Sequence, residues 1–189
     1  VVAADGAVIQ TGYETAGGSS GLGVFPPDTL ERVGLAAARR AVQMLSARPA
    51  PGGRMTVVLS SEAGGTMIHE AVGHGLEADL AQEGLSVYSK KRGKRIASPL
   101  VSVVDDPTLC GVRGSYSVDD EGVPAERTLL VDRGVLRTYL FDRLSAARDG
   151  RASNGHGRRQ SYHQRPIPRM SNTMILPGGD DPAKILAEV

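Results

Sequence analysis

Two histidines and a glutamate stand close together near the middle of the sequence. Residues 69–79 read His-Glu-Ala-Val-Gly-His-Gly-Leu-Glu-Ala-Asp, so His69 and His74 bracket Glu70. Zinc hydrolases need two imidazoles on one metal and a carboxylate close enough to take a proton from the attacking water. The familiar arrangement is His-Glu-x-x-His, in which a step of four residues returns the second histidine to the same helix face. The segment therefore has the residue types of a metallopeptidase site.

The step between these histidines is one residue too long for a regular helix. Five residues leave His69 and His74 about 140° apart around the helix axis. A π-bulge, with its i→i+5 hydrogen bond, needs five residues per turn and would bring the two rings together. Gly73 and Gly75 flank His74 and would ease that distortion. The alternative is two ordinary polar residues on an amphipathic helix, and the spacing alone does not decide between them.

Other residues that bind metals in proteins are scattered through the chain. We expect Glu77 and Asp79 to hydrogen-bond a ligand imidazole or to lie on the helix surface, in preference to binding a metal directly. His156 and His163 would reach a metal only if their arginine-rich loop folded over it. Cys110 follows an Asp-Asp-Pro turn, where we expect a small, half-buried thiol.

Basic residues gather in two places. Arg158, Arg159, Arg165 and Arg169 lie in one loop, and the fork of a guanidinium can hold a peptide carboxylate or carbonyl. A structural network of ion pairs explains these arginines equally well. Residues 90–95 carry five positive charges, which suit either an acidic partner or a solvated loop. The balanced net charge of the chain favours the solvated loop.

The elements that must position these residues follow from periodicity and turn signals. In the first part we expect a hairpin over residues 1–10 with a type I′ turn at Asp5-Gly6, a glycine-rich loop at 17–23 and a helix over 28–46. A connector at 49–53 precedes a buried strand at 55–60 and a second helix over 64–80. That helix would turn Ile68, Val72, Leu76 and Leu80 towards the core.

The second half of the sequence predicts mostly strands. We expect them at residues 100–104, 114–118, 128–131, 135–140 and 171–176, with a hairpin turn at 132–134. A short helix over 141–148 precedes a loop at 150–169, and another helix starts at 181. Early helices followed by paired strands predict an α+β fold, with a mixed or antiparallel sheet against which the histidine helix packs.

Composition narrows the class of protein. The chain has 189 residues, 22 Lys+Arg against 21 Asp+Glu, and 40% hydrophobic content, which excludes wholesale disorder and argues against a dedicated nucleic-acid binder. A single cysteine suits a reducing compartment, and we see neither a signal peptide nor a membrane span. Both ends look cut. We therefore expect residues 1–50 to end an N-terminal or linking region and residues 51–189 to begin a catalytic domain.

Several motifs together resemble one known family. They are the segment 69–79, Val-Val-Asp-Asp at 103–106, Asp-Asp-Glu-Gly-Val-Pro at 119–124, Gly-Arg-Arg-Gln-Ser-Tyr at 157–162 and Pro-Ile-Pro-Arg-Met-Ser-Asn-Thr at 166–173. In this order they resemble the TldD/PmbA family, specifically its TldD-like members. The chain departs from the family pattern at His156, where an asparagine is expected.

The resemblance implies a cytoplasmic zinc metallopeptidase that cuts unfolded proteins or leader peptides. It implies that His69 and His74 bind Zn²⁺, that Glu70 is the general base, and that a cysteine beyond residue 189 is the third ligand. Arg158 and Arg159 would then bind substrate. The expected partner is a TldE/PmbA-like paralogous subunit or a second copy, not a membrane or nucleic acid. The alternative is a non-catalytic, partner-binding module of the kind named modulator of DNA gyrase.

Overall fold

The computed structural model describes residues 1–18 and 21–188. The chain divides into two compact units, Val1–Met55 and Thr56–Val189. Within the described ranges, no helix combines the length and the apolar character that crossing a bilayer requires. The residues of chemical interest all lie in the second unit.

The first unit is a hairpin with one long helix. Strands β1 (Val2–Asp5) and β2 (Val8–Thr11) pair antiparallel and are followed by α1 (Thr29–Leu45), as predicted. The structure adds that α1 packs on both strands. A Cβ at Gly12 would lie 1.9 Å from the carbonyl oxygen of Ala37, so only glycine permits this approach. The expected glycine-rich loop contains a short 3₁₀ helix (Gly21–Val24), while its residues 19–20 lie outside the described ranges.

The turn of this hairpin differs from the predicted type. Asp5 pairs with Val8, so the two central residues are Gly6 and Ala7, one position later than expected. Gly6 has φ +57°, and Ala7 is not among the residues with positive φ. A type I′ turn needs positive φ at both central residues, so the predicted turn type was wrong.

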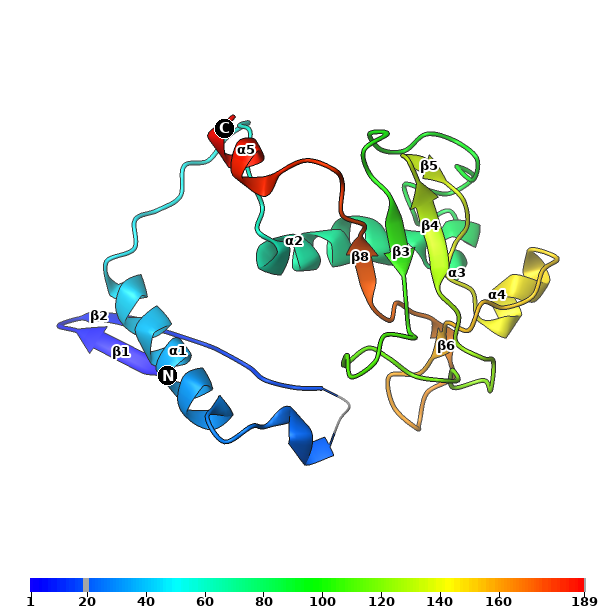
Figure 1. Ribbon diagram of the computed structural model, residues 1–189. Coiled ribbons are helices and arrows are strands. Elements are labelled where there is room, and N and C mark those ends of the chain that lie inside the picture. Colours follow the sequence, from blue (N-terminus) through cyan, green and yellow to red (C-terminus); the bar gives the residue numbers. More distant parts are fainter. Residues whose placement is uncertain (19–20, 189) are drawn as a thin grey trace. The chain divides into compact units, whose positions relative to one another are not determined.

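The second unit is built on a four-stranded antiparallel sheet in the order β5-β4-β3-β8 (Figure 1). The strands are β3 (Val103–Asp105), β4 (Thr128–Asp132), β5 (Val135–Leu136) and β8 (Thr173–Ile175). A separate two-stranded ribbon joins β6 (Gly157–Arg158) to β7 (Ile167–Pro168). Helices α4 (Arg143–Arg148) and α5 (Pro182–Ala187) also belong to this unit.

The predicted hairpin at 132–134 is present between β4 and β5. Asp132 pairs with Val135, which leaves Arg133 and Gly134 as the central residues. Their φ angles of 45° and 79° are both positive, as a type I′ turn requires. The turn type expected for the first hairpin is therefore found in the second.

The core lies between the sheet and the helix that carries the histidines. Leu76, Ala78 and Ala81 from this helix are buried against Val103, Leu130 and other residues of the strands. Ile68 is also buried, and Val72 packs at the edge of the core, as the apolar stripe predicted. Leu80, the fourth residue of that stripe, is half-buried and lies outside the core cluster. The α+β class with an antiparallel sheet and a packed histidine helix is therefore confirmed.

Two predicted strands are missing from the described chain. Residues 55–60 form no strand and are exposed, although their apolar, β-branched run is typical of a buried strand. Residues 114–118 are a loop, in which only Val118 makes an isolated bridge, to Pro124. Strand propensity measures the fit to neighbouring strands, and neither run has a neighbour here to pair with.

Candidate metal centre

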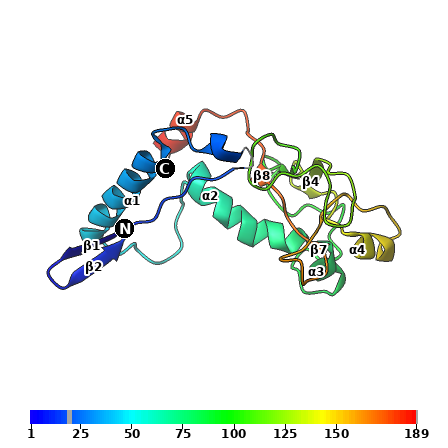
Figure 2. The ribbon, with the colours of Figure 1, turned by 90° about the horizontal axis from the view of Figure 1, so that it is seen from below.

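A π-helical turn occupies the histidine motif. The predicted single helix over 64–80 is α2 (Ser61–Ile68), a π-turn at His69–Gly73, a 3₁₀ turn at His74–Leu76 and, after a break, α3 (Ala78–Gln82). Figure 2 shows these segments following one another along one path. The backbone N–H of His74 donates to the carbonyl of His69, which is the i→i+5 bond of a π-helix. Of the two interpretations that the spacing left open, the π-bulge is therefore the one found.

The π-turn brings the two imidazoles into contact. The ring centroids of His69 and His74 lie 4.6 Å apart with an interplanar angle of 89°. One ligand atom from each of His69, Glu70 and His74 fits within 4.8 Å of the other two. His69 and Glu70 are exposed and His74 is half-buried, so the cluster opens to solvent. Two imidazoles and a carboxylate this close form a donor set that fits Zn²⁺.

The glycines beside His74 serve a purpose other than the one expected. Gly73 has φ −56° and ψ −59°, which any residue adopts, so its backbone needs no relief. A Cβ at Gly73 would lie 1.9 Å from the sulfur of Met170, and one at Gly75 would lie 2.7 Å from the ring of Tyr88. The two glycines therefore provide space for side chains that pack against the π-turn.

Glu77 fixes the orientation of His74. Its side chain is 3% exposed, and Oε1 lies 3.2 Å from His74 Nδ1. Arg169 Nη1 donates to both carboxylate oxygens at 3.3 Å. Burial raises the pKa of Glu77, against the opposing effects of Arg169 and His74. With Nδ1–H donating to Glu77, the lone pair of Nε2 is left for a metal, an arrangement common among histidine ligands.

A cavity of about 440 Å³ opens beside the histidines. The β6–β7 ribbon and the residues that follow it supply most of its other polar side chains. The lining residues are His69, His74, Glu77, Arg158, Arg159, Gln160, Arg169 and Met170. The structure therefore places both predicted arginines in the same cavity as the predicted metal ligands.

The two predicted arginines are held differently. Arg158 is half-buried, donates from Nη1 to the carbonyl of Met170 and lies 5.3 Å from the ring centroid of Tyr116. Arg159 is exposed, and its backbone N–H donates to Asp120 Oδ2 at 2.8 Å. The guanidinium of Arg158 is therefore fixed in place, whereas Arg159 lies at the open rim.

His156 is buried and does not join the metal cluster. Its Nε2 lies 3.0 Å from Asp105 Oδ1, and its Nδ1 lies 3.3 Å from Asn154 Oδ1. The Asn154 amide is oriented by Phe141, whose N–H donates to Oδ1, and by Tyr139, whose carbonyl accepts from Nδ2. Both ring nitrogens of His156 thus face oxygens that can only accept. The Asp105 carboxylate is the closer of the two partners, so His156 and Asp105 form a buried pair.

Asp105 gathers donors from three parts of the chain. Besides His156, its carboxylate accepts from the Ser171 backbone N–H at 3.0 Å, the Ser171 hydroxyl and the Thr173 hydroxyl at 2.5 Å. Burial alone would raise the pKa of Asp105, but the hydrogen bonds and the charge of His156 outweigh it, so this pKa is lowered. Sequence reasoning missed this pair. The available signal was an acidic residue ending an apolar strand.

The remaining predicted candidates lie outside the cluster. Cys110 is exposed, so the expected half-buried thiol was wrong. His163 is exposed and stacks on Tyr162 with ring centroids 3.8 Å apart. Asp79 lies in the first turn of α3 and accepts from the Leu80 N–H at 2.8 Å, and burial raises its pKa. In the basic run, Arg92 pairs with Asp149 at 2.5 Å.

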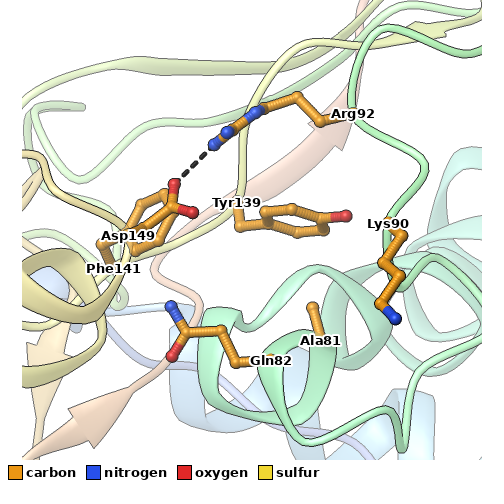
Figure 3. Close-up of a pocket in the computed structure, with 7 residues that line it drawn as sticks. All are labelled: Ala81, Gln82, Lys90, Arg92, Tyr139, Phe141 and Asp149. Atoms are coloured by element: carbon orange, nitrogen blue, oxygen red, sulfur yellow. Dashed lines mark hydrogen bonds and ion pairs between the residues drawn. The ribbon is translucent and has the colours of Figure 1, made fainter.

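A second cavity, of about 400 Å³, lies away from the histidines (Figure 3). Several of its polar groups already have partners, since Arg92 pairs with Asp149 and the Tyr139 hydroxyl donates to the carbonyl of Tyr88. Its lining residues are Ala81, Gln82, Lys90, Arg92, Tyr139, Phe141 and Asp149. None of the metal-cluster residues lines it, so this cavity is separate from the candidate metal centre.

Curated relatives are similar to this chain in sequence. A protein named metalloprotease from Methanothermobacter thermautotrophicus is 43% identical over 94% of this chain and 38% of its own length. A metalloprotease TldD homolog from Buchnera aphidicola is 44% identical over 75% of this chain and 29% of its own length. The chain thus spans well under half the length of these relatives.

Solved structures share the fold. A protein described as a candidate modulator of a DNA gyrase from Thermotoga maritima superposes with a TM-score of 0.71 at 27% identity, over 99% of this chain and 41% of its own. TldE from Thermococcus kodakarensis gives a TM-score of 0.69 at 19% identity, over 100% of this chain and 42% of its own. Residues 52–189 match the model of the PmbA/TldA metallopeptidase C-terminal domain. The chain belongs to the PmbA/TldD metallopeptidase family.

Proposed function

We propose that this chain carries the zinc site of a TldD-like metallopeptidase that hydrolyses peptide bonds in unfolded proteins or leader peptides. The observation that carries the proposal is the π-turn, which turns an irregular histidine spacing into two adjacent imidazoles with a carboxylate beside them. His69 and His74 would hold Zn²⁺. When bound, the metal polarises the scissile carbonyl and acidifies water.

The chain's own residues divide the remaining work. Glu70 is exposed beside the two histidines, where it takes a proton from the attacking water and passes it to the leaving amine. Glu77 holds the His74 ring through Nδ1, and Arg169 neutralises that buried carboxylate. Arg158 and Arg159, which line the same cavity, bind the peptide.

An extended substrate suits the sheet next to this site. In the described chain β8 pairs with β3 alone, so its outer edge offers backbone groups to an added strand. Main-chain pairing reads few side chains, which agrees with unfolded or leader peptides as substrates.

The chain's partial coverage of its relatives bears on the remaining ligand and on partners. We propose that a cysteine beyond residue 189 is the third ligand. We also propose that residues 1–50 end an N-terminal or linking region and that residues 51–189 begin the catalytic domain. The partner is a TldE/PmbA-like subunit or a second copy, since TldE shares this fold. The single cysteine suits action in the reducing cytoplasm.

The deciding experiment removes the base while leaving the metal ligands intact. In the full-length protein, Glu70→Gln is expected to abolish cleavage of an unfolded peptide while retaining one zinc per site and the native fold. The control Glu83→Gln changes an exposed carboxylate outside the cluster and should cleave at the wild-type rate. Unchanged cleavage by Glu70→Gln would refute the mechanism.

A partner-binding module is the second candidate, favoured by the structural relative described as a candidate modulator of a DNA gyrase. This function needs no base at position 70. If neither the wild-type protein nor Glu70→Gln cleaves any peptide, while both retain partner binding, the module replaces the peptidase.

A further inference from the structure

Positive charge exceeds negative charge in the cavity beside the histidines. Its lining includes three guanidinium groups but only one carboxylate, that of Glu77. Glu77 is taken by Arg169, whose Nη1 contacts both of its oxygens at 3.3 Å. The other two guanidinium groups of the lining, those of Arg158 and Arg159, have no carboxylate partner among the lining residues. A bound metal would add to this surplus.

Arg158 is the half-buried member of this surplus. Its guanidinium is held by the Met170 carbonyl and the face of Tyr116, both of which are neutral. Burial raises the pKa of the Tyr116 phenol, which donates to the Gly155 carbonyl at 2.9 Å, so that ring stays uncharged. A fixed guanidinium with donors to spare, held only by neutral groups, is suited to bind an anion.

The neighbouring carboxylates accept hydrogen bonds from backbone N–H groups and not from the two guanidinium groups. Asp119 accepts from the backbone N–H groups of Glu121, Val123 and Gly157, each at 2.9 Å. Asp120 accepts from the backbone of Arg159. Among the residues that the structure describes, no carboxylate forms an ion pair with the guanidinium of Arg158 or Arg159.

We propose that Arg158, with Arg159 at the rim, forms a carboxylate subsite that selects peptides bearing a negative charge close to the scissile bond. The inference rests on the proposed peptidase function and adds a substrate class to it. A guanidinium fork accepts a carboxylate through two parallel N–H···O bonds, which a neutral amide cannot reproduce with the same strength. The carboxylate is either the C-terminus of the peptide or the side chain of Asp or Glu.

Matched peptides separate the two sources. The full-length protein is tested with two pairs of peptides based on one unfolded sequence. The first pair differs at the C-terminus, which is a free acid in one peptide and an amide in the other. In the second pair both ends are blocked, and either Glu or Gln is placed near the cleaved bond. A C-terminal subsite predicts that the free acid is cleaved at least about tenfold faster in kcat/KM than the amide. A side-chain subsite predicts the same preference for Glu over Gln.

Variants assign the preference to Arg158. Arg158→Gln is expected to remove it by slowing the anionic peptide alone, and Arg158→Lys to restore it in part. The control Arg165→Gln changes an exposed arginine of the same hairpin that does not line the cavity, and it should leave the preference intact.

Peptide binding by fluorescence anisotropy, measured with the Glu70→Gln protein, gives a second readout that needs no cleavage. If the proteins with Arg158 and with Arg158→Gln each bound charged and neutral peptides with equal affinity, the subsite proposal would be overturned, even if all peptides were cleaved. Binding with the expected preference but no cleavage by the wild-type protein would instead overturn the proposed function and leave the subsite standing.

Discussion

Single residues in this site act through the space they leave as well as through their chemistry. The rings of His69 and His74 lie in contact because a backbone hydrogen bond joins these two residues, five positions apart. The π-turn packs directly on Met170. Met170 and Arg169 follow the β6–β7 ribbon, which contains Arg158. Gly73 is therefore one contact between the metal pair and the arginine side of the cavity, beside the contact of Arg169 with Glu77 and His74.

Gly73→Ala tests this contact. The new Cβ would lie 1.9 Å from the Met170 sulfur and 3.0 Å from its terminal methyl, so the buried methionine must move. We expect a loss of about 1–3 kcal/mol in the free energy of unfolding, measured by urea denaturation. The control Gly65→Ala lies in α2 with nothing within 4 Å of its Cβ, and should stabilise by up to about 1 kcal/mol. Equal effects of both substitutions would show that Met170 does not constrain the turn.

At the scale of elements, one buried carboxylate joins segments far apart in sequence. Asp105 ends β3 and binds His156 before β6, Ser171 after β7, and Thr173 in β8. The two ends of the arginine-bearing ribbon are therefore anchored on the sheet. This network explains how a loop rich in glycine, arginine and proline can hold guanidinium groups beside the histidines.

Asp105→Asn should lower stability in a pH-dependent way. Because the folded-state pKa of Asp105 is lowered from 3.8, its ionised form stabilises the fold above about that pH, and the benefit disappears as pH falls towards the folded value. At pH 7 the variant replaces a buried carboxylate that accepts from His156, Ser171 and Thr173 with a neutral amide, which costs about 1–3 kcal/mol.

Urea denaturation of wild type and variant from pH 7 to pH 3 measures this difference. The gap should be widest at neutral pH and narrow below pH 3.8, while Asp180→Asn, at an exposed site, should show little gap at any pH. A gap independent of pH would mean that Asp105 is not ionised in the fold.

The sequence predicted elements whose signals are local. The helix α1, the β4–β5 hairpin and the π-turn follow from periodicity, turn residues and histidine spacing. The strand expected at 55–60 failed because pairing depends on a neighbour that its own residues do not encode. The Asp105–His156 pair was out of reach for the same reason, since its partners lie 51 residues apart.

At the scale of the whole molecule, the candidate metal site belongs to one unit. His69, Glu70 and His74 and the residues that line their cavity all lie within Thr56–Val189, and the family match begins at residue 52. The first unit, with its own hairpin and helix, contributes none of these side chains. The chain as a whole nevertheless spans only 38% of the length of the Methanothermobacter relative.

This division predicts how zinc affinity changes with chain length. Residues 52–189 and residues 1–189 should bind zinc equally and weakly, because both contain the same two imidazoles and the same carboxylate. The full-length protein should bind more tightly by at least about tenfold, which is roughly 1.4 kcal/mol, because we place a third ligand beyond residue 189. Competition with a chelating dye measures all three, and His74→Ala in each provides the control for site-specific binding. Tight, stoichiometric zinc binding by residues 1–189 alone would locate the third ligand inside this chain. Glu70 would then be the first residue to reassign from base to ligand, because its carboxylate already lies beside both histidines.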